Sequence, residues 1–550
     1  MAFHVNTLIT LWLSLGLCLF WLRRTTNNCA ISITPALSYL TIGVAVLTLP
    51  LLYTTDVRFS NAAWRVAGVA IGLYWFFSCL QLRWHRGTLL TVLYGILFLV
   101  SVQAVIAGQQ LLMPYRAWVP LYGSRIYGTF FQPNVLASFI ATGITLALAM
   151  LLLPGLASKH VRLERLRQCG MFVLLAGLSA LLVCIQSRAG WLGGVAAILL
   201  LFRFGRLNSP RTTGAAAALT GGVLLGCGWL LSGHSILPLT DHAHSNLARW
   251  TMLRDTLAMI GDKPWQGWGY GGFEYDFQHF RINQTPPTLV TEIARHPHNE
   301  ILLWVVEAGL VGLAGVTLVL AGVGTVIRQA IKQDRIALMS GHPMAGMPTA
   351  LCFTVLPMAI HTLLEFPFYL SALHFVIFLL LLAIADRLST KEAKRRISPG
   401  ATGTILSGTL VALALGVSVL AGFTLRGEKA LTQVEKFGME DTTPLKALPH
   451  LSRLLLEQRI SFDEQVGALI TYNQTRDELL LESYSHWAQT YLQQRIDKNV
   501  YASLIQVLRH QKHIEAAERY RREAALFFPT DARFAPSAEI DTIRNNVDRQ

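Results

Sequence analysis

The sequence contains few charged residues: only 14% of its 550 residues are Asp, Glu, Lys or Arg, whereas a soluble domain carries about 25%. Hydrophobic residues make up 53% of the chain instead. Such a composition excludes a soluble globular protein. Because a bilayer-spanning helix needs roughly 20 mostly apolar residues, the long apolar runs predict an integral membrane protein.

Two long polar segments, 233–299 and 425–550, lack cysteine altogether. The seven cysteines fall in apolar runs or in loops that we assign to the cytoplasm, at Cys18, Cys29, Cys79, Cys169, Cys184, Cys227 and Cys352. A disulfide framework is therefore not expected. The first apolar run is followed by Arg23 and Arg24 with no small-residue cleavage site, so we expect this run to remain as a span.

A nucleotide-binding loop is also missing. The glycines of 267–272 (Gly-Trp-Gly-Tyr-Gly-Gly) lack the surrounding strand and helix of a dinucleotide fingerprint. We interpret them as a tight turn that lies near the membrane surface.

Apolar runs divide the chain into four parts. They predict an all-α polytopic membrane protein with about 12 transmembrane helices. Residues 1–232 form a block of eight spans, 233–299 a large polar loop, 300–424 a block of four spans, and 425–550 a helical extramembrane tail. The twelve runs lie near 6–22, 34–53, 62–82, 88–108, 134–153, 170–185, 190–206, 214–232, 300–326, 347–365, 368–386 and 403–424.

The net charge of +14 does not indicate a nucleic-acid partner, because the basic residues alternate between loops. The odd-numbered loops are rich in Arg and Lys, whereas the short even-numbered loops hold only Arg58, Arg116, Arg125 and Arg188. By the positive-inside rule the odd-numbered loops are cytoplasmic. The loop 233–299 and the tail are then expected on the opposite, non-cytoplasmic side.

The tail has a polar helical pattern with periodic Leu, Ala and Tyr. Its residues 516–529 resemble the second helix of a tetratricopeptide repeat. A small helical domain without such repeats is the simpler alternative, because one unit cannot bury its own core.

The segment Arg295-His296-Pro297-His298-Asn299-Glu300 carries the strongest functional signal, where the polar loop re-enters an apolar helix. Histidine is the side chain suited to moving a proton near neutral pH. We therefore predict that His298 is a general base, oriented by Asn299 or Glu300, with His296 as a supporting residue.

Other polar residues gather at the same predicted side of the membrane. Several arginines and a histidine at one aqueous face suit a lipid substrate that carries a diphosphate, because the guanidinium fork matches phosphate oxygens. His361 and Glu365 share one helix face, and ionisable groups within spans are usually functional. The predicted diphosphate ligands are Arg188, Arg249 and Arg125, and the predicted supporting residues are His296, His361, Glu365 and Asn134.

Each of these residues has a simpler alternative. Arg125 could anchor a lipid headgroup, Arg188 could be a solvated loop charge, and Arg254 a solvated helix charge. His361 with Glu365 could be a buried structural pair. A zinc site of His296, His298, His361 and Glu365 is a further alternative, but the sequence has no compact ligand motif. We expect no cofactor and no metal.

These segments together resemble the bacterial O-antigen ligase superfamily, and within it the pilin-type protein O-oligosaccharyltransferases. The last segment, followed by an extramembrane tail, resembles the protein-glycosylating branch more than the lipopolysaccharide ligases. The matching residues are Gly128–Asn134, Ser187–Trp191, Arg249-Trp250 with Pro264, Gly267 and Gly269, His298-Asn299-Glu300 with Glu307-Ala308-Gly309, and His361–Pro367.

The resemblance implies a fold of about a dozen helices and a large periplasmic loop over the active site in a bacterial inner membrane. It implies a glycan donor on undecaprenyl diphosphate and an acceptor Ser or Thr on a pilin or another exported protein. The essential loop histidine of the family corresponds to His298, and its diphosphate-binding arginines correspond to Arg188 and Arg249. Ligases of the family commonly have nine spans before the loop, whereas this sequence shows eight.

Three alternative functions remain open at this point. An O-antigen ligase or polymerase would use the same donor with lipid A core or another glycan as acceptor. A lipid-glycan flippase or transporter would show internal repeats and ionisable residues near mid-membrane, neither of which the sequence displays. A non-catalytic assembly protein would use the tail to bind partners.

Overall fold

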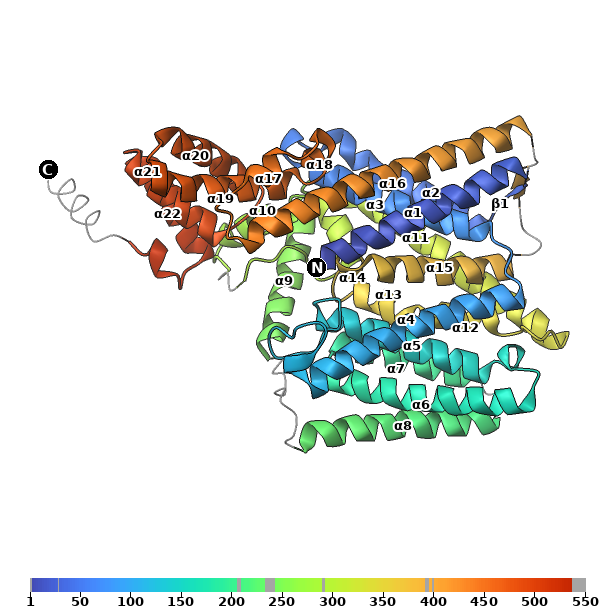
Figure 1. Ribbon diagram of the computed structural model, residues 1–550. Coiled ribbons are helices and arrows are strands. Elements are labelled where there is room, and N and C mark those ends of the chain that lie inside the picture. The colour runs from blue at the N-terminus through green and yellow to red at the C-terminus, as the bar shows by residue number, and fades with distance from the viewer. Residues whose placement is uncertain are drawn as a thin grey trace.

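A computed structural model describes residues 2–27, 29–204, 209–232, 243–288, 292–390, 395–397 and 400–536. The chain is a bundle of long, roughly antiparallel helices with a smaller helical domain at one end (Figure 1). The N-terminal block consists of α1 (Ala2–Thr26), α2 (Pro35–Thr48), α3 (Asp56–Leu80), α4 (Arg86–Leu112), α5 (Pro133–Leu152), α6 (Val161–Ile185), α7 (Arg188–Phe204) and α8 (Ser209–Leu231).

The remaining elements follow in chain order. The long loop contains α9 (Ala243–Asp262) and α10 (Phe273–Ile282). The second block contains α11 (Glu300–Met339), α12 (Met347–Thr354), α13 (Leu356–Thr362), α14 (Pro367–Leu370), α15 (Ala372–Ser389) and α16 (Ala401–Lys436). The tail contains α17 (Thr443–Lys446), α18 (His450–Leu455), α19 (Glu457–Thr475), α20 (Glu478–Leu492), α21 (Lys498–His510) and α22 (Ile514–Phe527).

All twelve predicted apolar runs lie in helices. Ten helices of the described residues are long and apolar enough to cross a membrane, which confirms the all-α polytopic class. The other two runs form shorter helices: α7 has 17 residues, and the run 347–365 is divided into α12 and α13. The strands in the described part of the chain, β1 (Ile31–Ile33) and β2 (Arg395–Ile397), form a short antiparallel pair.

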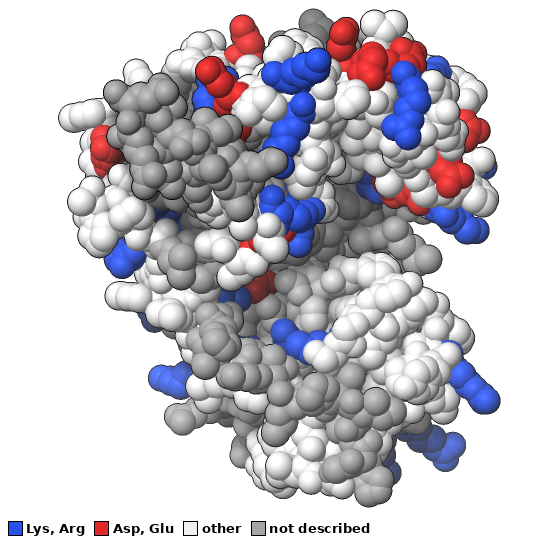
Figure 2. All heavy atoms as spheres, turned by 90° about the vertical axis from the view of Figure 1, so that its left-hand side faces the viewer, with Lys and Arg blue, Asp and Glu red and all other residues white. Residues whose placement is uncertain are grey.

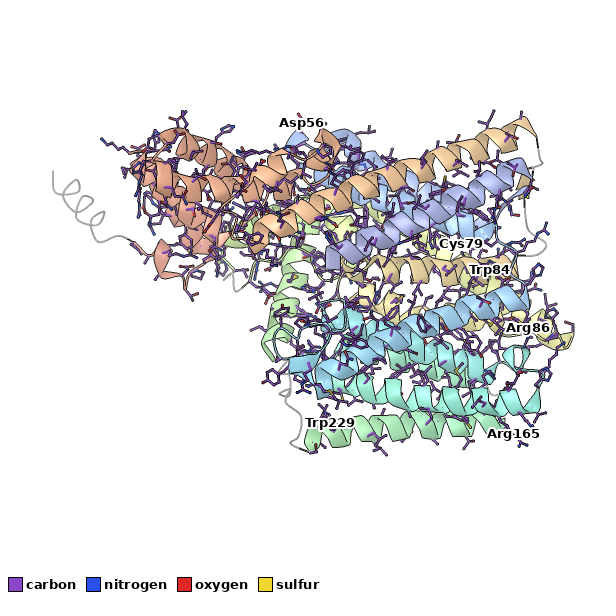
Figure 3. The ribbon with its side chains drawn as sticks, viewed as in Figure 1. Asp56, Cys79, Trp84, Arg86, Arg165 and Trp229 are labelled. Atoms are coloured by element: carbon purple, nitrogen blue, oxygen red, sulfur yellow. The ribbon has the colours of Figure 1, made fainter. Side chains whose placement is uncertain are left out.

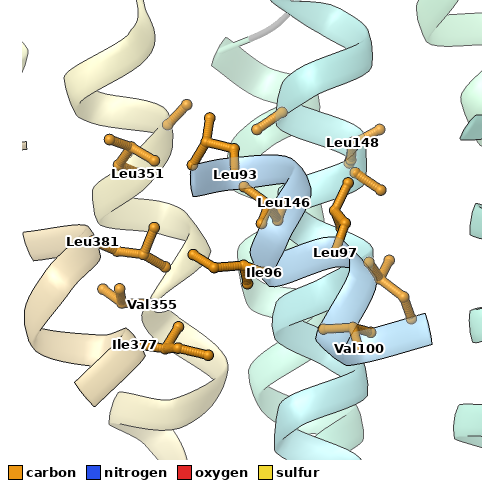
Figure 4. Packing of buried hydrophobic residues seen from close by; sticks show 14 of the residues in the cluster. Leu93, Ile96, Leu97, Val100, Leu146, Leu148, Leu351, Val355, Ile377 and Leu381 are labelled. Carbon is orange, nitrogen blue, oxygen red and sulfur yellow. The ribbon is translucent and has the colours of Figure 1, made fainter. Parts of the chain in front are cut away.

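Helix α5 lies at the centre of the bundle, since all of its residues from Val135 to Leu152 are buried. Leucines and valines of α4 and α5 pack there against α12 and α15, as Figure 4 shows. Within a membrane, small residues stabilise helix pairs by letting the backbones approach. A Cβ atom at Gly190 of α7 would lie 2.5 Å from the Ala137 Cβ of α5, so glycine is needed at this contact.

The N-terminus, the long loop and the tail all lie at one end of the bundle (Figure 1). His4 Nδ1 lies 2.6 Å from Glu428 Oε2 near the end of α16, and Asn6 Nδ2 donates to the Leu370 carbonyl at 3.0 Å. Arg86 and Arg165 lie at the opposite end (Figure 3). This arrangement agrees with the predicted pairing of the loop and the tail on one side, away from the basic loops.

The tail is helical, as predicted, but its boundary differs from the sequence estimate. Helix α16 continues through residue 425 without interruption and ends at Lys436. Helices α19 to α22 then pack against each other in succession around a core that includes Tyr484, Tyr501 and Leu504. The tetratricopeptide assignment remains a prediction.

Candidate functional site

The polar segment 295–300 enters the bundle through a capped helix start. Asn299 has extended backbone angles, and its side chain accepts a hydrogen bond from the Leu302 N–H at 3.0 Å, as an N-cap residue does. Its Nδ2 donates to the Leu363 carbonyl at 3.1 Å. Asn299 therefore joins the start of α11 to the turn between α13 and α14, which brings two separated motifs of the sequence together.

Glu365 is the centre of a buried polar cluster at this turn. Its Oε1 accepts from Arg249 Nη2 at 2.8 Å and from Asn134 Nδ2 at 2.5 Å, and its Oε2 lies 3.1 Å from His361 Nε2. Only 4% of Glu365 is exposed. A buried carboxylate is tolerated when it is paired and hydrogen-bonded, and these partners come from α5, α9 and α13.

The cluster continues into the bundle through His361. Its Nδ1 lies 2.8 Å from Ser138 Oγ of α5, and that hydroxyl lies 3.3 Å from His374 Nε2 of α15. Both histidines are completely buried. Ser138, itself in contact with His374, therefore fixes the ring of His361, which in turn supports Glu365.

Arg125 reaches the same cluster from the loop before α5. Its Nη2 donates to Asn134 Oδ1 at 3.3 Å and to the Gln186 carbonyl at 3.0 Å, and Ser187 Oγ donates to Asn134 Oδ1 at 2.7 Å. Arg125 thus lies within the protein and binds backbone and side-chain oxygens. The alternative of a simple headgroup anchor does not describe these contacts.

His298 lies beside this cluster and faces a cavity. The imidazole is half-buried, and it lines a cavity of about 1170 Å³ together with Arg249 and Arg254. Burial lowers the pKa of His298, and the Arg249 guanidinium lowers it further, while the Glu365 carboxylate acts in the opposite direction. A lowered pKa keeps the ring neutral near pH 7, which is the state in which an imidazole accepts a proton.

The structure changes the predicted partners of His298. Asn299 caps α11, and Glu300 binds other groups: its Oε2 lies 3.3 Å from His296 Nε2, and its Oε1 accepts from Tyr369 OH at 2.8 Å. Neither residue has a hydrogen bond to His298 in the described part of the chain. Both histidine rings instead pack against Phe366. The ring centroids are 4.7 Å apart for His296 and 5.8 Å apart for His298. In the described residues the orienting contacts of His298 are therefore the Phe366 ring and a backbone hydrogen bond with Leu364.

Arg188 lies at the exposed N-terminus of α7 and donates from Nη1 to Asn246 Oδ1 of α9. Asn246 precedes Arg249 by one turn of the same helix. The structure therefore connects Arg188 and Arg249 through α9. Arg188 is absent from the described lining of the cavity that His298 shares with Arg249.

Residues 264–269 form a turn that overlaps the glycine-rich stretch 267–272, and this turn packs directly on α11. Trp268 N–H donates to the Val306 carbonyl and Gly269 N–H to the Glu307 carbonyl, both at 2.9 Å. Helix α11 is interrupted at this level, because Gly309 has φ 57° and ψ −139°. The tight turn expected from the sequence is present, and the structure adds that it pairs with the break in α11.

Beneath this turn, Arg65 of α3 pairs with Glu307 of α11, whose side chain is only 1% exposed. The Phe273 N–H at the start of α10 also donates to Glu307 Oε1, at 3.2 Å. Through these two contacts Glu307 ties the loop to both transmembrane blocks.

The tail contacts the long loop next to the histidine segment. Glu274 of α10 accepts from Arg495 Nη1 at 2.7 Å and from the Ile496 N–H at 3.1 Å. Arg295 Nε lies 3.4 Å from the same carboxylate. Figure 2 shows this end of the molecule hollowed between two parts, with basic side chains along the hollow.

The zinc alternative finds no suitable geometry. Across the residues that the structure describes, no three His, Cys, Asp or Glu side chains are grouped as metal ligands require. His296 pairs with Glu300, and His361 pairs with Glu365. The expectation of a metal-independent reaction remains a prediction.

Several residues of the site were not identified from the sequence. Ser138 and His374 complete the cluster around Glu365, but a lone serine or histidine in an apolar run carries no periodic signal. Arg254 was interpreted as a solvated charge, and its side chain is 59% exposed, but it also lines the cavity. Asp255 directly follows Arg254 in the sequence and is completely buried. The adjacent acid and arginine are the sequence signal that could have identified Arg254.

The fold and the site together define a multi-pass membrane protein with a basic, histidine-bearing cavity at one end. A family model described as O-antigen ligase matches residues 170–317, and a second, described as virulence factor membrane-bound polymerase, C-terminal, matches residues 349–539. These matches support the O-antigen ligase superfamily and a role in membrane glycan transfer or polymerisation. A comparison with curated proteins gives no significant match. Neither family description says whether the acceptor is a protein.

Proposed function

We propose that this protein transfers a preassembled glycan from undecaprenyl diphosphate to Ser or Thr hydroxyls of exported proteins such as pilin. The active site would face the periplasm from a bacterial inner membrane. The observation that supports the proposal is that one cavity is lined by both His298 and Arg249, since an imidazole can accept a proton and a guanidinium can bind phosphate.

The reaction follows from these two groups. Neutral His298 takes the proton from the acceptor hydroxyl as its oxygen attacks the anomeric carbon. The new glycosidic C–O bond forms while the C–O bond to the diphosphate breaks, and the electron pair leaves with undecaprenyl diphosphate. Arg249, and Arg188 one helical turn away through Asn246, neutralise the departing diphosphate. A single displacement of this kind inverts the anomeric configuration.

Replacement of His298 tests the proposal. His298→Ala should lower transfer by about 10²- to 10⁴-fold, the usual contribution of a general base. Exported proteins and lipopolysaccharide from cells supplied with a lipid-linked glycan would be compared by mass spectrometry, with and without the variant chain. The matched control is His160→Ala, because His160 is exposed and lies before α6 at the opposite end of the bundle. Near-normal glycosylation by a correctly inserted His298→Ala variant would overturn the assignment.

A second candidate is an O-antigen ligase or polymerase that uses the same donor. It is favoured by the family description of a membrane-bound polymerase, which matches residues 349–539. The same mass spectra separate the two candidates. Glycan on exported proteins supports the first candidate, whereas longer lipid-linked chains or glycan on lipid A core support the second.

A further inference from the structure

The cavity at His298 extends well beyond the reacting groups. Arg249 and His298 lie at one part of it, and its wall continues along α9 through Thr251, Arg254 and Ala258. The nine helical rises from Arg249 to Ala258 span about 13.5 Å at 1.5 Å per residue. A diphosphate and one hydroxyl do not fill such a length, so the far part of the cavity accommodates another portion of a substrate.

Two arginines in this far part are held by one buried carboxylate. Asp255 Oδ1 accepts from Arg254 Nε at 2.9 Å and from Nη2 at 2.8 Å, and Asp255 Oδ2 lies 3.2 Å from Arg281 Nε. Asp255 is completely buried, and Arg281 is 4% exposed although it lines the cavity. The guanidinium groups are therefore fixed before any ligand binds, which reduces the entropy cost of binding.

The opposite wall supplies neutral donors and acceptors and an aromatic ring. Thr288 Oγ1 accepts from Arg254 Nη2 at 3.1 Å and donates to Gln284 Oε1 at 2.7 Å. Glu292 and Phe280 line the same wall. Phe280 is held edge-on against Trp268, with ring centroids 5.7 Å apart.

This combination matches the chemistry of a sugar chain. Each sugar hydroxyl both donates and accepts hydrogen bonds, and the wall offers guanidinium and amide donors beside hydroxyl and carboxylate acceptors. A sugar ring also has an apolar face that packs on an aromatic side chain. An isoprenoid chain would leave these polar groups unpaired, at a cost in binding free energy.

We propose that the cavity wall formed by α9 and residues 280–292, excluding 289–291, is an oligosaccharide subsite, in which Asp255 positions Arg254 and Arg281 for sugars beyond the reacting one. The inference rests on the proposed function. The sugars belong either to the glycan of the donor or to an acceptor glycan, and both sources share this chemistry.

Donors of two lengths test the subsite. Purified protein in liposomes would be given the lipid-linked glycan of its host, either intact or trimmed to the sugar next to the diphosphate. The variants are Arg254→Gln and Thr288→Val, and Asp255→Asn serves as a third variant for the positioning role. The ratio of kcat/KM for the intact donor to that for the trimmed donor should fall about tenfold or more, since Arg254→Gln and Thr288→Val each remove a hydrogen bond to a sugar and Asp255→Asn releases the arginines that make such bonds. Arg519→Gln is the matched control, because Arg519 is exposed on the far tail helix α22.

Separate titrations identify the source of the sugars. A rise in KM for the donor assigns the subsite to the donor glycan, and a rise in KM for a glycan acceptor assigns it to the acceptor chain. Unchanged ratios and unchanged KM values in Arg254→Gln and Thr288→Val, in an enzyme that transfers normally, would overturn the subsite. A rise confined to the KM for a peptide acceptor would also overturn the subsite. Absence of any transfer by the wild-type protein would instead overturn the proposed function.

Discussion

At the scale of single residues, Glu365 accounts for more of the site than any residue of the histidine segment. It binds one arginine, one asparagine and one histidine from three helices. Removing a charge from water costs several kcal/mol, so these three partners are what allow the carboxylate to remain buried. Its charge also acts on His298 and raises the pKa of that imidazole.

A conservative substitution at Glu365 tests this positioning role. Glu365→Gln keeps the shape but removes the charge, so Arg249 loses its ion pair and transfer should fall by about 10- to 100-fold, as misplaced reacting groups do. Without the carboxylate the pKa of His298 falls further. His298 then stays neutral at lower pH, and the acidic limb of the kcat/KM profile should move toward lower pH. A fall in activity with an unmoved limb would indicate only a structural role for Glu365.

The sequence predicted the members of this site better than their contacts. His298, Arg249, Asn134, His361 and Glu365 do converge, because polar groups that interrupt apolar runs at one membrane face have few places to lie. The partner of each residue depends on helix rotation, which a sequence pattern does not specify. Asn299 was therefore expected to orient His298. Its observed role is that of a helix N-cap, which the sequence could have predicted.

At the scale of elements, helix existence was predictable, but the interruption of α11 was not. Apolar runs specify spans through composition alone, and each of the twelve runs is helical. The break at Gly309 depends on the backbone of residues 264–269 that packs against it. Leu310 N–H donates to the Pro264 carbonyl at 2.9 Å. Only a contact between distant segments explains this glycine.

Substitution of Gly309 should therefore destabilise the protein. A Cβ atom there would lie 2.4 Å from the Trp265 carbonyl oxygen, and the φ of 57° disfavours any side chain. Gly309→Ala should cost about 2 kcal/mol or more, measured as a lower midpoint of thermal unfolding in detergent. Gly324→Ala is the control in the same helix, because its added Cβ meets nothing within 4 Å. Equal midpoints for the two variants would contradict the proposed packing of the turn on α11.

At the scale of the whole molecule, the tail is part of the covering of the site. Its residues Arg495 and Ile496 share Glu274 with Arg295 of the histidine segment. A second contact joins His279 Nε2 of the loop to Glu523 of the tail at 3.0 Å. Ile282 and Ile293 of the loop also pack on the hydrophobic core of the tail.

Loosening this contact should affect both partners at once. Arg495→Ala leaves the buried Glu274 with fewer donors, which costs about 1–3 kcal/mol. Hydrogen exchange should then speed up in α10 and in the α20–α21 turn together, while α5 at the bundle centre is unaffected. Arg519→Ala is the control on the exposed face of α22. Faster exchange confined to the tail would show that the two segments are not coupled.

The neighbouring positions of α1 and α16 have a consequence for biosynthesis. His4 and Glu428 are in contact although 424 positions separate them along the chain, so α1 reaches this partner helix only after α16 has been synthesised. A nascent chain released before residue 401 would therefore hold α1 without its contacts to α16.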